Sequence, residues 1–274
     1  MLIKAIYFVL LILALLVCFS CFYQHIENFF VFYPQKSFDG APEDWRLTYE
    51  DVTFDTEDKE RLHGWFFPLR NNAPVVLFCH GNAGNISHRL DNIKHLTEQN
   101  MQVFIFDYRG YGKSSGKPSE TGLYKDGLAA YDFLVKQKHV LPERLILFGR
   151  SLGAAIALEI ALKKNVAGII LESAFTSSRD MARTLSLFKI FASFLPTHYN
   201  NLEKIGRITV PKLIVHGEED DIVPFSMGRE IYNTARSPKY FFPIKNAGHN
   251  DTYLVGGKKY FETLSAFVKD RKIE

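Results

Sequence analysis

Gly149-Arg150-Ser151-Leu152-Gly153 is the stretch of this chain that decides its fold. The apolar run Arg144–Phe148 precedes it and is bounded upstream by Pro142, which is typical of a short buried strand. The run Ala154–Leu162 follows it and is rich in alanine and leucine, which predicts a helix. The five residues therefore occupy a strand-to-helix turn.

A serine flanked by glycines at such a turn matches the nucleophile elbow, which exposes a reactive hydroxyl at the end of a sheet. Gly149 and Gly153 lack a Cβ, so the backbone can turn sharply and the helix can pack close to the strand. The helix N-terminus would then point at negative charge that develops beside Ser151. A glycine-rich turn with a capping serine is the alternative, so the prediction also depends on suitable partners downstream.

Composition limits the classes of protein to consider. The chain has 274 residues, is 47% hydrophobic, and carries a net charge of +3. This size fits one large α/β domain. The charge is too small to indicate a nucleic-acid partner, and no Lys/Arg-rich run supports one. Of the 3 cysteines only Cys79 lies outside the N-terminal apolar run, so no disulfide framework is expected.

The N-terminal segment predicts a membrane anchor. Residues 5–23 are apolar apart from Ser20 and would span roughly 28 Å as a helix, close to the hydrocarbon core of a bilayer. A cleaved signal peptide or a buried helix are the alternatives, but a signal-peptide core is usually shorter and no A-x-A-like site follows. We expect residues 1–27 to be an uncleaved single-pass anchor and residues 28–274 to form the folded domain. Lys4 precedes the span and no lysine follows before Lys36, which places the N-terminus in the cytoplasm and the domain on the opposite side.

The remaining periodicity predicts strands alternating with helices, as in a mostly parallel sheet covered on both faces. The strands are expected at residues 47–54 and 62–67, which form a hairpin, and at 75–79, 103–106, 166–171, 212–216 and 239–242. Helices are expected at residues 87–99, 123–138, 226–234 and 253–272.

Two patterns suggest cofactor sites but fail on inspection. Gly112-Lys113-Ser114 resembles the end of a phosphate-binding P-loop, yet Asp107 stands where that motif needs its first glycine. His80 follows a predicted strand, but no partner has metal-ligand spacing, so it is expected to order its loop. We therefore expect neither a metal nor an organic cofactor.

The segment from Ala174 to Ile208 has no strand pattern. Apolar residues recur in it at helical spacing, at Met181, Leu185, Phe188, Phe191, Phe194 and Leu195, with Pro196 as a stop. A helix that faces the core and a cap that lines an acyl pocket both explain this pattern.

Four motifs in order carry a family resemblance: HGNAGN at 80–85, FDYRGYGKSSG at 106–116, GRSLGAAIAL at 149–158 and HGEEDDIVP at 216–224. Together they resemble the α/β-hydrolase superfamily of serine hydrolases. Within it they resemble the membrane-anchored alpha/beta-hydrolase domain-containing proteins of the thirteen and seventeen type. The resemblance runs from about Tyr49 to the C-terminus, with an anchor in a corresponding place. It implies an α/β-hydrolase fold with a mostly parallel central sheet, helices on both faces, and an insertion at about 174–208 that covers the site.

The resemblance also implies a catalytic triad. Ser151 is the expected nucleophile, and His249 is the expected base because this fold orders its triad as serine, acid, histidine. The family pattern HGxxDxxVP places the acid at Asp220, with Asp221 and Glu172 as alternatives.

In this fold the loop after the third strand and the residue after the nucleophile supply the oxyanion-hole amides. We expect these donors to be the backbone N–H groups of Asn82, with Ala83 as the alternative, and of Leu152.

These residues predict a membrane-anchored serine hydrolase that cleaves carboxylic ester or thioester bonds of acyl or lipid-type substrates. A serine peptidase or amidase could use the same triad. A non-catalytic binding protein that keeps the fold is the third hypothesis.

Overall fold

The computed structural model describes residues 6–7, 10–11, 28–69, 73–185, 189 and 192–273. The chain divides into two compact units, Met1–Tyr33 and Pro34–Glu274. Among the described residues, no helix has both the length and the apolar character needed to cross a membrane. The predicted anchor at residues 5–23 lies mostly outside them; only its residues 6–7 and 10–11 are described, and they are helical. The anchor therefore stays a prediction.

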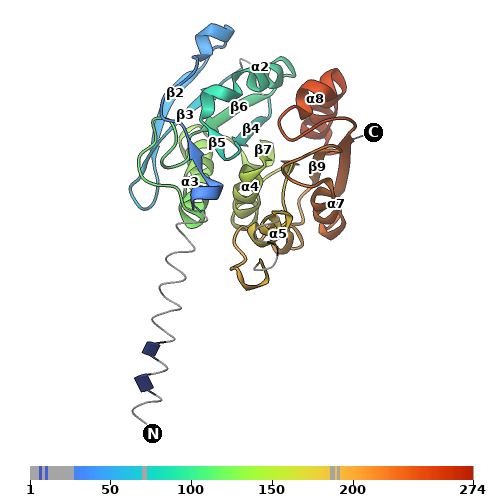
Figure 1. The fold of residues 1–274 in the computed structure, drawn as a ribbon. Helices are drawn as coiled ribbons and strands as arrows, with labels where there is room; N and C mark the ends of the chain where they lie inside the picture. Colours follow the sequence, from blue (N-terminus) through green and yellow to red (C-terminus); the bar gives the residue numbers. More distant parts are fainter. Residues whose placement is uncertain are drawn as a thin grey trace. The chain divides into compact units, whose positions relative to one another are not determined.

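An eight-stranded sheet forms the centre of the second unit (Figure 1), with the strand order β10-β9-β8-β7-β4-β6-β3-β2. Its strands are β2 (Glu50–Asp55), β3 (Arg61–Phe67), β4 (Val75–Cys79), β6 (Gln102–Phe106), β7 (Leu145–Arg150), β8 (Gly168–Glu172), β9 (Lys212–Gly217) and β10 (Lys239–Ile244). The antiparallel pairs are β2 with β3 and β3 with β6, and all other neighbours run parallel. The expected hairpin and mostly parallel sheet are confirmed.

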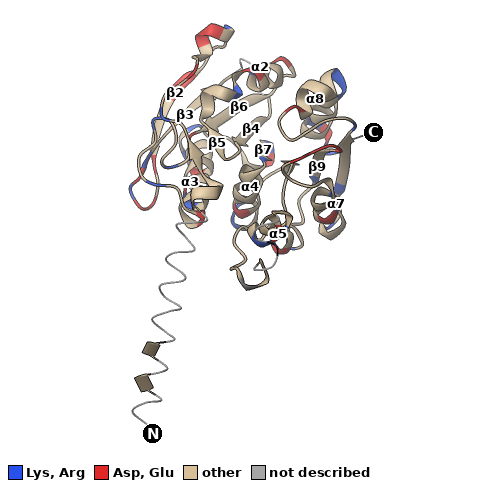
Figure 2. Ribbon diagram, viewed as in Figure 1, with Lys and Arg blue, Asp and Glu red and all other residues tan. Residues whose placement is uncertain are grey.

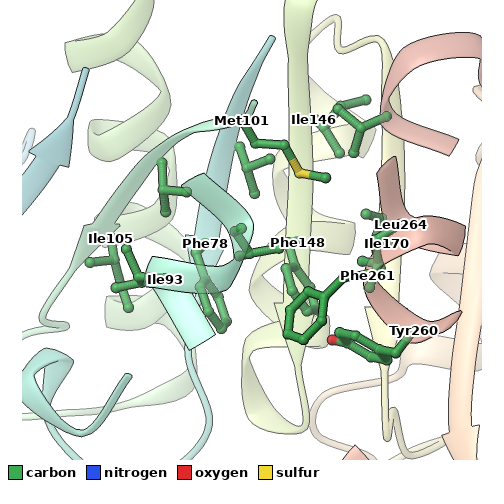
Figure 3. Packing of buried hydrophobic residues seen from close by; sticks show 14 of the residues in the cluster. Phe78, Ile93, Met101, Ile105, Ile146, Phe148, Ile170, Tyr260, Phe261 and Leu264 are labelled. Atoms are coloured by element: carbon green, nitrogen blue, oxygen red, sulfur yellow. The ribbon is translucent and has the colours of Figure 1, made fainter. Parts of the chain in front are cut away.

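The central strands are continuous apolar runs because both of their faces are covered. Every residue of β4, β7 and β8 is buried. On one face Phe78 and Phe148 stack with their ring centroids 4.6 Å apart. Phe261 from α8 (Thr252–Asp270) belongs to the same apolar cluster (Figure 3). The strands β4 and β6 carry no charged residue, and the central strands β7 and β8 each carry one, Arg150 and Glu172, at their last position (Figure 2).

The remaining elements connect these strands. The helices are α2 (Leu90–Glu98), α3 (Glu120–Asp132), α4 (Leu152–Lys163), α5 (Ser178–Thr184), α6 (Asn201–Ile205) and α7 (Phe225–Thr234). Short turns of helix are η1 (Pro42–Trp45), η2 (Ile86–Arg89), η3 (Phe133–Gln137), η4 (Pro142–Arg144) and η5 (Ala192–Phe194), and two-residue strands are β1 (Tyr33–Pro34) and β5 (Ala83–Gly84). Gly127 of α3 lets that helix approach α4, because a Cβ there would lie 2.4 Å from the side chain of Ile156.

The apolar segment at 181–195 does not form the continuous helix that its spacing suggests. The helix α5 ends at Thr184, and Leu185 has extended backbone angles (φ −87°, ψ 117°). Leu185 is also 49% exposed, so it does not face the core. Phe188 and Phe191 lie outside the described residues, and so does the side chain of Phe194.

Candidate active site

Ser151 stands at a strained turn between β7 and α4. Its backbone angles are φ 52° and ψ −116°, a conformation that non-glycine residues rarely adopt. The flanking glycines make the turn possible: a Cβ on Gly149 would lie 2.5 Å from the carbonyl oxygen of Gly153. A Cβ on Gly153 would lie 1.9 Å from the carbonyl oxygen of Cys79. The geometry therefore requires glycine at both positions, as the sequence suggested.

Three predicted side chains meet at this turn. The Nε2 atom of His249 lies 3.1 Å from the Oγ atom of Ser151. The Nδ1 atom of His249 lies 2.8 Å and 3.0 Å from the two carboxylate oxygens of Asp220. Since a carboxylate only accepts, Nδ1 donates to Asp220 and leaves Nε2 free to accept the serine proton.

The Asp220 carboxylate is itself fixed by its own loop. Its Oδ1 atom accepts hydrogen bonds from the backbone N–H groups of Ile222 (3.0 Å) and Val223 (2.7 Å). Burial alone would raise the pKa of Asp220, but hydrogen bonds from His216 and His249 outweigh it and hold the pKa well below its usual range. Asp220 is therefore charged at neutral pH.

A close approach of two loops brings acid and histidine together. Gly217 ends β9, and a Cβ there would lie 2.3 Å from the carbonyl oxygen of Ala247, two residues before His249. The N–H of Glu219 also donates to that oxygen over 2.9 Å. The loop after β9 is thus bonded directly to the histidine loop.

The alternative acids lie elsewhere. Asp221 is exposed, while Asp220 is only 8% exposed. Glu172 is fully buried and forms an ion pair with Arg150, whose Nε lies 3.1 Å from Oε1. The structure brings Asp220, and neither alternative, to the Nδ1 atom of His249.

The side chain of His80 orders its own loop, as expected, and the side chain of His216 contacts the loop that carries Asp220. The ring of His80 is buried, bonds the carbonyl oxygen of Gly81 over 2.7 Å and stacks on Tyr108. Burial lowers the pKa of His80 to about 3, so this ring is neutral. The Nε2 atom of His216 lies 2.9 Å from the carbonyl oxygen of Val223 and 3.3 Å from Asp220 Oδ2.

The loop after β4 lies against the nucleophile. A Cβ on Gly81 would lie 3.7 Å from the Cβ of Ser151, so this glycine faces the serine closely. Two tyrosines hold the loop: Tyr108 donates to the carbonyl oxygen of His80 (2.8 Å), and Tyr111 donates to that of Asn82 (2.7 Å). The expected donor Asn82 is half-buried in this loop, and Leu152 is the first residue of α4, where N–H groups lack intrahelical partners.

The roles of Tyr108 and Tyr111 were not foreseen. Both follow β6, which lies beside β4 in parallel, so their loop and the loop after β4 leave the same edge of the sheet. The order of the strands in the sheet would have indicated that these tyrosines contact the loop after β4. The spacing of residues along the sequence does not indicate it.

The rejected P-loop segment has a structural role. The hydroxyl of Ser114 donates to the carbonyl oxygen of Asp107 (2.7 Å) and accepts from the N–H of His63 (3.0 Å). Within the described ranges, no cluster of three or more His, Cys, Asp or Glu side chains is arranged to hold a metal ion.

Known proteins resemble this chain over most of its length. A family model described as serine aminopeptidase, S33, matches residues 70–204. An uncharacterized protein of Mycobacterium tuberculosis is 36% identical over 81% of this chain and 80% of its own length. The alpha/beta hydrolase domain-containing protein WAV2 of Arabidopsis thaliana is 34% identical over 85% of this chain and 83% of its own length. In solved structures, an esterase of Pyrococcus furiosus superposes with a TM-score of 0.76 and 21% identity, covering 89% of this chain and 99% of the esterase. At that identity the last likeness speaks for the fold alone.

Proposed function

This chain belongs to the α/β-hydrolase superfamily, and from that premise we propose that it is a serine hydrolase that uses Ser151, His249 and Asp220. One observation carries the proposal. An unbroken chain of hydrogen bonds, 3.1 Å and then 2.8 Å long, joins a strained serine to a histidine and a charged aspartate. The three residues lie on three separate loops, and 69 and 29 positions separate them along the chain. A merely structural serine needs no such chain.

The acylation step follows from these contacts. His249 takes the proton of Ser151 as the serine oxygen attacks the carbonyl carbon of the substrate. Asp220 keeps the histidine in the tautomer that accepts at Nε2 and stabilises the imidazolium. His249 then protonates the departing alcohol or thiol, and the acyl group remains on Ser151. Water, activated by the same histidine, cleaves the acyl-enzyme and restores the free serine.

The backbone N–H groups of Leu152 and Asn82 are proposed to stabilise the oxyanion of both steps. Leu152 contributes from the positive end of α4. Each such donor is worth about 10²–10³ in rate at comparable sites. The bond between His80 and the Gly81 carbonyl oxygen supports the assignment to Asn82, because that carbonyl belongs to the same peptide group as the Asn82 N–H, and Tyr111 holds the peptide group that follows.

Carboxylic esters or thioesters of acyl chains are the proposed substrates. Two large apolar side chains that follow the catalytic residues closely in the chain are exposed: Ile222, after Asp220, is 48% exposed, and Leu254, after His249, is 61% exposed. An acyl chain would cover such surface favourably. A peptidase or amidase is the second candidate, and the serine aminopeptidase description of the matching family model favours it.

Hydrolysis by the full-length chain in detergent tests the proposal. We expect p-nitrophenyl esters to be cleaved, with longer acyl chains preferred over acetate, and aminoacyl p-nitroanilides to be cleaved more slowly. The variant Ser151→Ala should lose all of this activity while its melting temperature stays near that of the wild type. Activity that survives in the folded variant would refute the nucleophile, and a preference for the anilides would favour the peptidase.

Residues 1–27 are proposed to anchor the enzyme in a membrane, with the catalytic domain on the non-cytoplasmic side. All residues from 5 to 23 except Ser20 are apolar, which supports this proposal. Release of the protein from membranes by alkaline carbonate would contradict it.

A further inference from the structure

Glu172 is a fully buried carboxylate beside the nucleophile elbow. Strands β7 and β8 run parallel with Arg150 paired to Glu172, so the two side chains extend from neighbouring positions at the strand ends. Arg150 and Glu172 form an ion pair (Nε to Oε1, 3.1 Å), and the N–H of Ser151 donates to the carbonyl oxygen of Glu172 over 2.8 Å. The elbow is therefore bonded to the end of β8 through both backbone and side chain.

The same carboxylate holds the helix that follows the catalytic histidine. Thr252, the first residue of α8, donates its hydroxyl to Oε1 of Glu172 over 2.9 Å. Tyr260, which follows the kink of α8 at Gly257, donates its hydroxyl to Oε2. Figure 3 shows Tyr260 beside Phe261 at the face of the sheet. Burial raises the pKa of Tyr260 well above its ordinary value, so the hydroxyl keeps its proton.

Arg150 links the nucleophile turn to the loop that carries His249. Its Nη2 atom donates to the backbone carbonyl oxygen of His249 over 3.1 Å. Arg150 precedes Ser151 in the chain, and the His249 ring returns to the Ser151 hydroxyl over 3.1 Å. Two separate contacts thus join the histidine to the nucleophile turn. One is the bond between the His249 ring and the Ser151 hydroxyl, and the other is the bond from the Arg150 guanidinium to the His249 carbonyl oxygen.

We propose that Glu172 and Arg150 are positioning residues that set the distance between His249 and Ser151, with Thr252 and Tyr260 as the donors that orient Glu172. The inference rests on the proposed function. A buried ion pair gives little net stability, because desolvation offsets most of its attraction. The pair instead fixes the orientation of Glu172. Its two carboxylate oxygens accept hydrogen bonds from Arg150 of the elbow and from Thr252 and Tyr260 of α8.

Conservative variants test this role without leaving a charge unpaired. Tyr260→Phe and Thr252→Val each remove one hydroxyl donor to Glu172 and keep the shape of the side chain. We expect each to lower kcat for p-nitrophenyl esters about tenfold with KM unchanged, because small misplacement of reacting groups costs rate rather than ground-state binding. Thr252→Ser keeps the hydroxyl and should restore the rate.

Two control variants remove a tyrosine bond and a threonine bond that do not reach Glu172. Tyr131→Phe removes a buried tyrosine bond to the carbonyl oxygen of Asn165 (2.8 Å), and Thr263→Val removes a bond within α8 to that of Lys259 (2.8 Å). Both should keep the wild-type kcat even where the melting temperature falls.

The inference is overturned if Tyr260→Phe and Thr252→Val keep the wild-type kcat, or if their losses are matched by those of the controls. Wild-type protein without any Ser151-dependent hydrolysis would instead overturn the proposed function, so the two failures are distinguishable.

Discussion

Replacing Asp220 by asparagine should invert the hydrogen-bonding pattern of His249. The Oδ1 atom of Asp220 accepts two backbone N–H groups, from Ile222 and Val223, so the asparagine oxygen must take that place. The asparagine NH2 then occupies the position of Oδ2, 2.8 Å from Nδ1 of His249. A donor at that position selects the tautomer with its proton on Nε2, which faces Ser151 and can no longer accept the serine proton. Loss of the correct tautomer costs about 10⁴ in kcat in serine proteases, or about 5.4 kcal/mol of transition-state stabilisation.

Steady-state hydrolysis of a p-nitrophenyl ester by wild type and Asp220→Asn measures this loss. We expect kcat to fall by about 10⁴ while KM changes little, because Asp220 is buried and acts through His249. The neighbouring exposed carboxylate provides the control, and Asp221→Asn should behave as wild type. The reasoning is refuted if the two variants exchange these behaviours, or if Asp220→Asn keeps more than about a tenth of the wild-type kcat.

Three further predictions concern the elbow, the oxyanion loop and pH. Gly153→Ala should lower the free energy of unfolding in urea by about 3 kcal/mol or prevent folding, since its Cβ would lie 1.9 Å from the Cys79 carbonyl oxygen; unchanged stability would contradict this. Tyr111→Phe should lower kcat about tenfold by loosening the loop that carries the Asn82 N–H, and an unchanged kcat would show that the loop needs no such support. The pKa of Asp220 is depressed from 3.8, so its charged form stabilises the fold above that pH and loses this contribution as pH falls through the folded-state pKa. The unfolding free energy of wild type minus that of Asp220→Asn should therefore be constant at neutral pH and decrease below about pH 4, and an increase there would contradict the assignment.

The central strands and the elbow could be predicted because their causes are local. Val75–Cys79 is a continuous apolar run bounded by Pro74 and His80, and the structure assigns β4 the same residues. Gly149 and Gly153 indicate that backbone segments pack closely at the elbow, and the structure leaves no room for a Cβ at either position. Such features need no knowledge of distant partners.

The choice among neighbouring acids depends on long-range geometry. Residues Glu218–Asp221 are all acidic, and composition alone cannot say which carboxylate turns inward. The loop after β9 approaches the histidine loop at Gly217, and there Asp220 is buried against His249 while Asp221 stays exposed. That contact joins segments that the sequence keeps apart.

The bonds of Arg150 and Glu172 were missed for the same reason. Arg150 occupies the variable position of the elbow motif. Glu172 ends a predicted strand, and the sequence does not show that this strand lies beside the one that ends at Arg150. Only the register of β7 on β8 brings the two together. At Leu185, helical spacing was misleading because the helix had already ended at Thr184.

Mass-spectrometric mapping of a fluorophosphonate adduct tests the central claim most directly, since only an activated serine attacks this reagent at neutral pH. Full-length protein should carry one adduct, on the peptide that contains Ser151, and Ser151→Ala should carry none. An adduct on a different residue, or no adduct on protein shown to be folded, would contradict the account.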